Sequence, residues 1–163
     1  QTLVQYRAVD YANAIFAVIG ITAIIVQGGL IGLLRKRFRE VALVASGVLI
    51  MAIGMLLVPW PASFAGQFPV IIIFALGNGL FSPVLSALVS QYSPDDKRGE
   101  LFGVYQSMQS LGRIAGPIIG GLVFEVLSHQ APYYVGGSIM LVAFVLVMYL
   151  KKSDSVEVAE AVA

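Results

Sequence analysis

The chain has 163 residues, of which 58% are hydrophobic and only 12% charged, and its mean hydropathy is +0.88. Because soluble domains contain about a quarter charged residues, this composition excludes an ordinary soluble domain. The formal net charge of +1 comes without an aromatic-interleaved basic stripe, so we expect no nucleic-acid partner, and the lack of cysteine excludes a disulfide framework.

The first ten residues, QTLVQYRAVD, contain neither an initiator Met nor a cleavable signal pattern with a basic start. We therefore expect the chain to be part of a longer polypeptide. The following stretch, Tyr11 to Leu34, has no charged residue. Since about 20 apolar residues in a helix cross a bilayer core of roughly 30 Å, this stretch predicts a first membrane-spanning helix.

The rest of the chain divides at its charged residues and at clusters of Pro, Gly and Trp. The five predicted helical spans are 11–34, 41–58, 68–91, 100–127 and 132–150. Lipid cannot satisfy an open sheet edge, so the sequence predicts an all-α, polytopic membrane helix bundle. We expect this membrane domain to occupy residues 1–153 and a disordered cytoplasmic tail to follow over 154–163.

The break PWPASFAGQFP, residues 59–69, is expected to be a turn, with Trp60 as an anchor at the membrane interface. Basic residues gather in the connections expected on the opposite side of the membrane from this turn. They follow the first, third and fifth spans: Arg35, Lys36, Arg37, Arg39, Lys97, Arg98, Lys151 and Lys152. Positive charge stays in the cytoplasm during insertion, so residue 1 should lie outside and residue 163 inside. Orienting the helices could be the whole role of these residues.

The fourth span contains LGRIAGPIIGG, in which Gly112, Gly116 and Gly120 recur every four residues. This spacing, extended by Gly121, lets membrane helices approach closely. Pro117 has no amide hydrogen and its ring crowds the carbonyl of residue 113, so we expect a bend there. A helix that rocks during function and a static, Gly-rich packing surface are both compatible with this pattern.

Arg113 lies near the middle of the same span, roughly 18 Å from Leu101 at about 1.5 Å per residue. An Arg at such depth costs about 3 kcal/mol or more, so it should face a water-filled cavity or a polar partner. Glu125 is again about 18 Å away along the helix and cannot be that partner. The alternative is a structural anchor that snorkels or binds the carbonyls of a kinked helix. The candidate residues of a substrate path are Arg113, Gln109, Tyr105, Asn78 and Gln27.

Titratable residues are scarce at membrane depth. Asp10 and Glu125 both lie towards the outer surface, so a proton-coupling group is expected outside this chain. His129 falls in an outer loop, where a lone His is usually solvated. The sequence has no metal-ligand cluster, catalytic triad or phosphate-binding loop, and we expect no enzyme activity, no catalytic residues, no metal and no cofactor.

Three features occur in order: QGGLIGLLRKRFRE, then GNGLFSPVLSALVSQYSPDDKRGELFGVYQSMQSLGRIAGPIIGG, then a closing apolar helix with a basic end. Together they resemble the C-terminal half of the major facilitator superfamily, and most of all its drug:proton antiporters of the tetracycline-exporter type. The resemblance implies helices 8 to 12 of a twelve-helix transporter built from two six-helix halves around a central site. Family loops of the first kind usually carry a Gly within the basic run, where this chain reads Arg37-Phe38-Arg39-Glu40.

The resemblance further implies a secondary active transporter that exports small amphiphilic compounds by alternating access, coupled to protons, in a bacterial inner membrane. Its partners would be membrane lipid, the N-terminal half of the transporter and a small-molecule substrate. The aromatic residues Phe16, Phe74, Phe81, Phe102 and Tyr105 would suit a lipophilic cation. Two alternatives stay open: a truncated or accessory membrane protein without transport of its own, and an importer of sugars or metabolites with the same fold.

Overall fold

The computed structural model describes the backbone of residues 2–61 and 63–162 and the side chains of residues 11, 13–61 and 63–149. The described chain is helical and contains no strand, which confirms the all-α prediction. The elements are α1 (Thr2–Ile25), η1 (Val26–Leu30), α2 (Ile31–Arg35), α3 (Glu40–Leu57), α4 (Phe64–Tyr92), α5 (Arg98–Val126) and α6 (Ala131–Val162).

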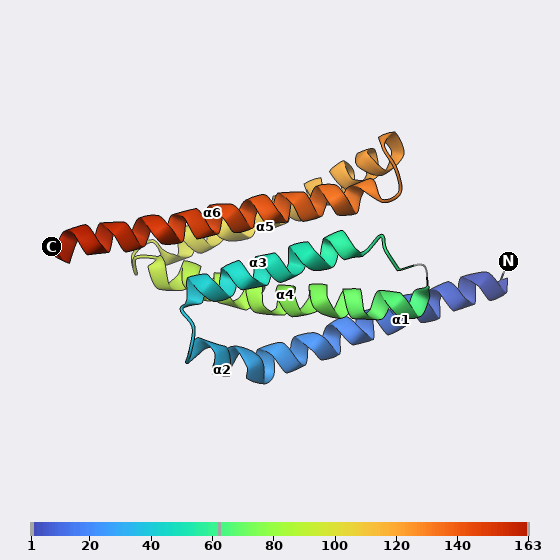
Figure 1. Cartoon of the computed structure of the whole chain (residues 1–163), viewed down its shortest axis with the longest axis horizontal. Helices are drawn as coiled ribbons and strands as arrows, with labels where there is room; N and C mark the ends of the chain where they lie inside the picture. Colours follow the sequence, from blue (N-terminus) through green and yellow to red (C-terminus); the bar gives the residue numbers. More distant parts are fainter. Residues whose placement is uncertain (1, 62, 163) are drawn as a thin grey trace.

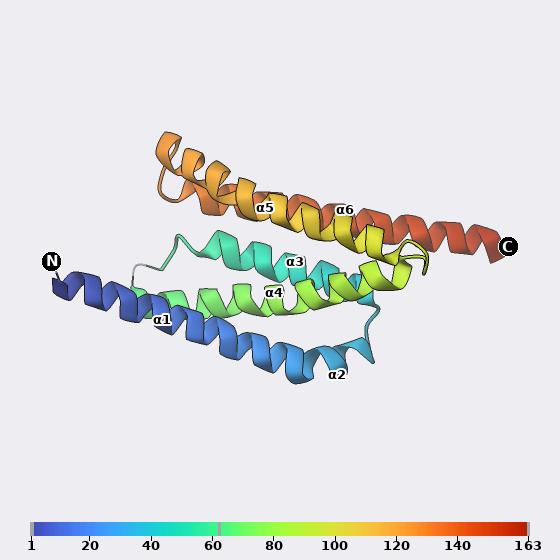
Figure 2. The ribbon, with the colours of Figure 1, turned by 180° about the vertical axis from the view of Figure 1, so that it is seen from behind.

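Helices α1 and α2, joined through η1, run in one direction, and α3, α4, α5 and α6 then alternate in direction along the long axis of the molecule (Figure 1). The α2–α3 and α4–α5 connections lie at the same end as the C-terminus, as the view from behind also shows (Figure 2). The α3–α4 and α5–α6 connections lie at the other end, near the N-terminus. The basic cluster 35–39 therefore shares one end of the bundle with Lys97 and Arg98.

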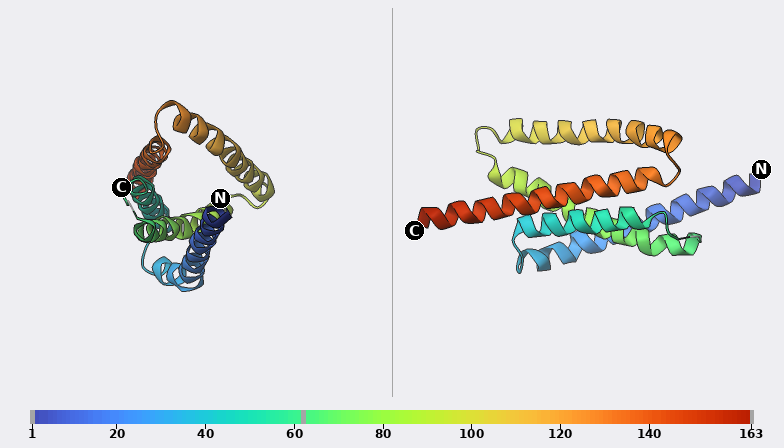
Figure 3. Two further views of the ribbon diagram at one scale, coloured as in Figure 1. Left: turned by 90° about the vertical axis from the view of Figure 1, so that its right-hand side faces the viewer. Right: turned by 45° about the horizontal axis from the view of Figure 1, so that its top comes forward.

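Helix α3 packs against α4 on one side and α6 on the other, while α1 packs against α4. Seen along the bundle, α1, α4, α3, α6 and α5 follow one another around an arc (Figure 3, left). Glycine allows the close approach of α3 and α4. A Cβ placed on Gly47 would lie 2.9 Å from the Phe81 amide nitrogen, and one on Gly77 would lie 2.6 Å from that of Met51. Ordinary carbon contacts are about 3.5–4.0 Å, so no larger residue fits at either position without movement.

The best-buried apolar cluster lies between η1, α2, α3 and α4. It consists of Val26, Ile31, Leu43, Val44, Leu80 and Val84. The π-helical turn η1 sets the spacing of its first two members, because the Ile31 amide donates to the Val26 carbonyl five residues earlier. Val26 and Ile31 are both buried. In an unbroken α-helix Leu30 would share the face of Val26, but here it is only partly buried.

Two helices start earlier than the sequence predicts. Helix α1 begins at Thr2 instead of residue 11, and α4 begins at Phe64 instead of residue 68. The expected turn over 59–69 is therefore too long, and Pro69 lies inside α4. The Ser63 hydroxyl caps this helix by accepting a hydrogen bond of 3.2 Å from the Gly66 amide. Pro69 is close to the helix start, where it removes one intrahelical bond without ending the helix.

The C-terminal segment also differs from the sequence prediction. Helix α6 continues to Val162, whereas residues 154–163 are expected to form a disordered tail. After Gly137 the sequence contains neither Gly nor Pro, and its last residues are mainly Ala, Glu and Val. Ala and Glu favour helix, so no residue there ends it. Residue 163 lies outside the described residues.

The basic connection between α2 and α3 is a tight turn. The amides of Arg37 and Phe38 both donate to the Leu34 carbonyl, at 3.0 and 2.8 Å. An ion pair of 2.7 Å joins Arg35, at the end of α2, to Glu40, at the start of α3. No described residue has a positive φ, so this turn does not require a glycine.

Among the described residues, four helices are long and apolar enough to cross a membrane. They are Asn13–Arg35, Glu40–Leu57, Phe64–Tyr92 and Ala131–Tyr149. The fourth predicted span, now α5, has 29 residues and so is long enough to cross, but Gln106, Gln109 and Arg113 make it more polar than the others. A helix of this composition at membrane depth needs water or a polar partner along one side.

Candidate functional site

Polar residues follow one face of helix α5. Tyr105, Gln109 and Arg113 are spaced four residues apart, so their side chains point in nearly the same direction. Arg113 lies near the midpoint of α5, and no residue of this helix is buried within the described chain. On α4, Asn78 and Ser82 are also four residues apart, so their side chains also point in nearly the same direction.

These two polar faces meet across an open cleft of about 700 Å³. The structure thus brings together four of the five candidate path residues: Asn78, Tyr105, Gln109 and Arg113. The apolar part of the lining comes from α3, α4 and α6 and consists of Met51, Phe74, Phe81, Leu85 and Met140. Gln27 does not line this cleft; it lies in η1, where its side chain is exposed.

One hydrogen bond joins α4 to α5 at the edge of the cleft. The hydroxyl oxygens of Ser86 and Tyr105 are 3.1 Å apart, and Ser86 donates its proton to the Ser82 carbonyl, also at 3.1 Å. Because a serine hydroxyl has a single proton, Tyr105 must be the donor in the bond between the helices. The Phe102 ring packs edge-on against Tyr105, with centroids 5.6 Å apart. Tyr105 is therefore held by its own helix and by α4.

Tyr105→Phe and Ser86→Ala should each destabilise the protein by about 1 kcal/mol, because each removes the same hydrogen bond between the helices. The double variant should be little worse than either single variant. Denaturation of the purified protein in detergent by increasing SDS measures these differences. If the two losses were simply additive, the two hydroxyls would not be partners.

The cleft is positively charged. The two ion pairs found in the described part of the chain, Arg35–Glu40 and Arg98–Asp95, lie at the end of the bundle with the basic connections. Neither involves Arg113, and no carboxylate is among the described residues that line the cleft. Between the described side chains, Arg113 also forms no hydrogen bond with Gln27, Asn78 or Gln109, other polar residues considered for the path. Among the described side chains the Arg113 guanidinium has no partner, so it can meet a ligand in the cleft.

The glycine stripe of α5 is open in this chain. A Cβ added to Gly112, Gly116, Gly120 or Gly121 would have no described atom outside its own helix within 4 Å. Helix α5 continues through Pro117, whose missing amide hydrogen leaves the Arg113 carbonyl without its usual helical donor. The close packing expected at this stripe is not formed with the described part of the chain and stays a prediction. Close packing within the chain occurs at Gly47 and Gly77, which the sequence analysis did not select.

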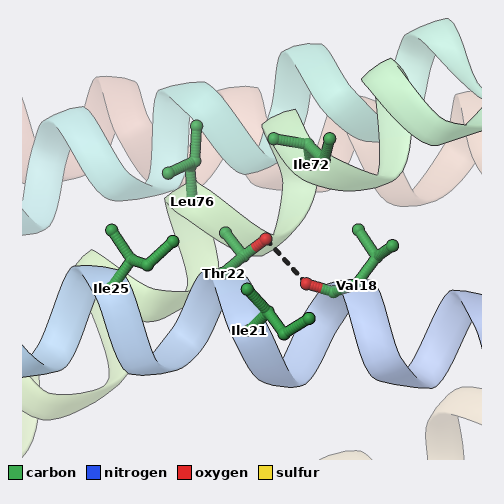
Figure 4. Close-up of a pocket in the computed structure, with 6 residues that line it drawn as sticks. All are labelled: Val18, Ile21, Thr22, Ile25, Ile72 and Leu76. Carbon is green, nitrogen blue, oxygen red and sulfur yellow. Dashed lines mark hydrogen bonds between the residues drawn. The ribbon is translucent and has the colours of Figure 1, made fainter.

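A second hollow, of about 360 Å³, lies between α1 and α4 (Figure 4). Thr22 is the polar residue among the described residues that line it, and the others are Val18, Ile21, Ile25, Ile72 and Leu76. The Thr22 hydroxyl donates to the Val18 carbonyl at 2.7 Å, so its proton is already used (Figure 4). This surface offers a ligand no free polar donor, and we assign no site there.

The family model of the Major Facilitator Superfamily matches residues 4–162. The chain belongs to this superfamily. The tetracycline resistance protein, class C, of Escherichia coli is 30% identical over 129 residues, which are 77% of this chain and 32% of that protein. Major facilitator superfamily domain-containing protein 10 of Mus musculus is 26% identical over 136 residues, 83% of this chain and 30% of that protein. The chain thus spans about a third of the length of these two relatives.

The quinolone resistance protein NorA of Staphylococcus aureus is 32% identical over 79 residues, 48% of this chain and 20% of that protein. A crystal structure of the peptide transporter POT in complex with alafosfalin has the same fold, with a TM-score of 0.73 and 22% identity over 87% of this chain and 29% of that one. The superfamily and the fold predicted from the sequence motifs are confirmed. With its four membrane-length helices, this superfamily member is a multi-pass membrane protein.

Proposed function

We propose that this chain is part of a secondary active transporter that exports small amphiphilic compounds by alternating access, driven by protons entering the cell. The observation that carries the proposal is the cleft beside Arg113. This charged residue lies near the middle of a membrane-length helix and has no ion-pair partner among the described residues. Ionisable residues at this depth usually mark a substrate or ion path. The relatives named for tetracycline and quinolone resistance support export as the direction.

The proposal assigns a partner to each surface of the bundle. Apolar side chains on α5 such as Ile114, Ile118 and Leu122 are more than half exposed, and the open glycine stripe lies on the same helix. These exposed surfaces suit a second helix bundle, the N-terminal half of the transporter, while lipid covers the outer faces. No carboxylate lines the described part of the cleft, so the proton-binding group would belong to that other half.

The basic end of the bundle supports a cytoplasmic C-terminus, because positive connections are retained inside. Arg35, Lys36, Arg37 and Arg39 share this end with Lys97 and Arg98, and the chain ends there as well (Figure 1). Two of the three relatives described above come from bacteria, which supports a bacterial plasma membrane.

Transport is tested with the intact protein in inside-out vesicles. With an acidic interior, tetracycline should accumulate inside the vesicles well above the level in protein-free vesicles, because entering protons drive export in the cell. Adding a protonophore should abolish the accumulation, which is followed by tetracycline fluorescence. Accumulation only under the opposite gradient would indicate an importer. Accumulation no faster than that in protein-free vesicles would indicate an accessory protein.

A further inference from the structure

We propose that the cleft recognises a carboxylate on its substrate through Arg113, so that the transported compounds are amphiphilic anions or zwitterions rather than simple lipophilic cations. This inference rests on the proposed transport function and names the substrate class of the same site. It replaces the expectation of a cationic substrate that the aromatic residues suggest in the sequence.

The polar part of the cleft combines one fixed positive charge with side chains that can donate hydrogen bonds. Among the described lining residues Arg113 alone is charged, and the amides of Asn78 and Gln109 lie in the same lining. None of the hydrogen bonds between described residues uses the side chain of any of these three. A guanidinium has five N–H donors in a planar fork that matches the two oxygens of a carboxylate, and an amide adds two more donors. Such a group of donors selects an oxyanion.

The aromatic lining does not reverse this preference. Phe74, Phe81 and Tyr105 could attract a cation, and such an attraction raises affinity by about 2- to 30-fold. A cation held about 4 Å from the guanidinium would be repelled, and at an effective dielectric constant of 20 this lowers the affinity by up to about a thousandfold, less where water screens the two charges. At such a separation the repulsion exceeds the attraction, so a cation without a neutralising carboxylate is disfavoured beside Arg113.

The remaining lining accommodates the apolar part of such a compound. Met51 and Met140 face the cleft from α3 and α6, beside Phe74, Phe81 and Leu85 of α4. Methionine side chains are flexible and adapt to ligands of different shape. The volume of about 700 Å³ lies within the usual range for small-molecule sites. The cleft therefore pairs one fixed charge with an adaptable apolar wall.

The proposal is tested with two dyes that differ only at one group: rhodamine B, which carries a free carboxylate, and its ethyl ester. Their binding to the intact protein in lipid nanodiscs is measured by fluorescence anisotropy at neutral pH. We expect rhodamine B to bind about tenfold more tightly, which corresponds to about 1.4 kcal/mol for the added charged contact. Equal affinities, tighter binding of the ester, or no binding of either dye would overturn the proposal.

Three variants show whether the preference comes from Arg113. Arg113→Gln should bring the affinity ratio of the two dyes close to one, and Arg113→Lys should retain part of it because it keeps the charge but loses the planar fork. Arg37→Gln removes a positive charge from the α2–α3 connection, which does not line the cleft, and should leave the ratio unchanged. A ratio that survives Arg113→Gln contradicts the assignment.

The same dyes separate this inference from the proposed function. If rhodamine B binds preferentially but no pH gradient moves either dye or tetracycline across vesicles, transport fails and the recognition of a carboxylate stands. If both dyes are moved by the gradient and bind equally well, transport stands and the recognition of a carboxylate is wrong.

Discussion

Gly77→Ala is expected to destabilise the protein by about 1–3 kcal/mol, although it adds a single methyl group. In the native packing that methyl carbon would lie 2.6 Å from the Met51 amide nitrogen and 2.7 Å from the Gly47 carbonyl oxygen. Both are backbone atoms in the middle of α3, so the two helices must separate to make room. Their separation would also loosen the contacts between Gly54 of α3 and Phe74 of α4, where a Cβ would lie 2.9 Å from Phe74 Cα.

The matched control is Gly99→Ala in the first turn of α5, where an added Cβ has no described atom outside its own helix within 4 Å. Alanine favours helix over glycine by up to about 1 kcal/mol, so this variant should be as stable as the native protein or slightly more stable. The temperature at which each purified variant loses its monodisperse peak in size-exclusion chromatography gives the comparison. Similar losses in both variants would show that α3 and α4 do not depend on glycine for their contact.

Arg113→Leu is expected to reduce gradient-driven export at least about tenfold while leaving the amount of inserted protein the same or higher. A hydrogen bond to a charged group contributes about 1.5–3 kcal/mol, which accounts for a loss of this size. Insertion should not suffer, because an Arg at the middle of a membrane helix costs about 3 kcal/mol and Leu at the same place is favourable. Initial export rates divided by the amount of membrane-inserted protein measure the effect.

Gln106→Leu is the control for this variant. Gln106 is an exposed polar residue of the same helix and does not line the cleft, so its replacement should leave the normalised export rate close to that of the native protein. Normal export by the Arg113→Leu variant would show that this residue is a structural anchor. Loss of export in both variants would indicate that α5 tolerates no change of polarity along its length.

The presence and order of the helices could be predicted because a long uncharged stretch in lipid has few alternatives to helix. The helix ends were harder to predict. Proline usually interrupts helices, which favours a turn that ends at Pro69, but near a helix start proline removes only one hydrogen bond. The extension of α6 to Val162 was missed because charged residues after Tyr149 resemble a solvated tail, although they favour helix as well.

For the site, the spacing of residues within each helix places Asn78 and Ser82 on one face and Gln109 and Arg113 on another. The spacing could not show that these two groups face each other, because this depends on how α3, α4 and α6 pack. Glycines gave an ambiguous signal, since the chain has 17 and several recur at helical spacing. Gln27 was selected for its polarity alone, and its position in η1 directs it elsewhere.

The π-helical turn η1 gives this membrane helix a tolerance to changes in length. Deleting one residue between Val26 and Ile31 would convert the wide turn into an ordinary one and leave Ile31 four residues after Val26, on the same face. The same deletion within α1 would rotate the residues before it by about 100° relative to those after it and so disturb the packing of α1 against α4. Homologous chains that are one residue shorter at this place can therefore keep the same contacts with an unbroken α-helix.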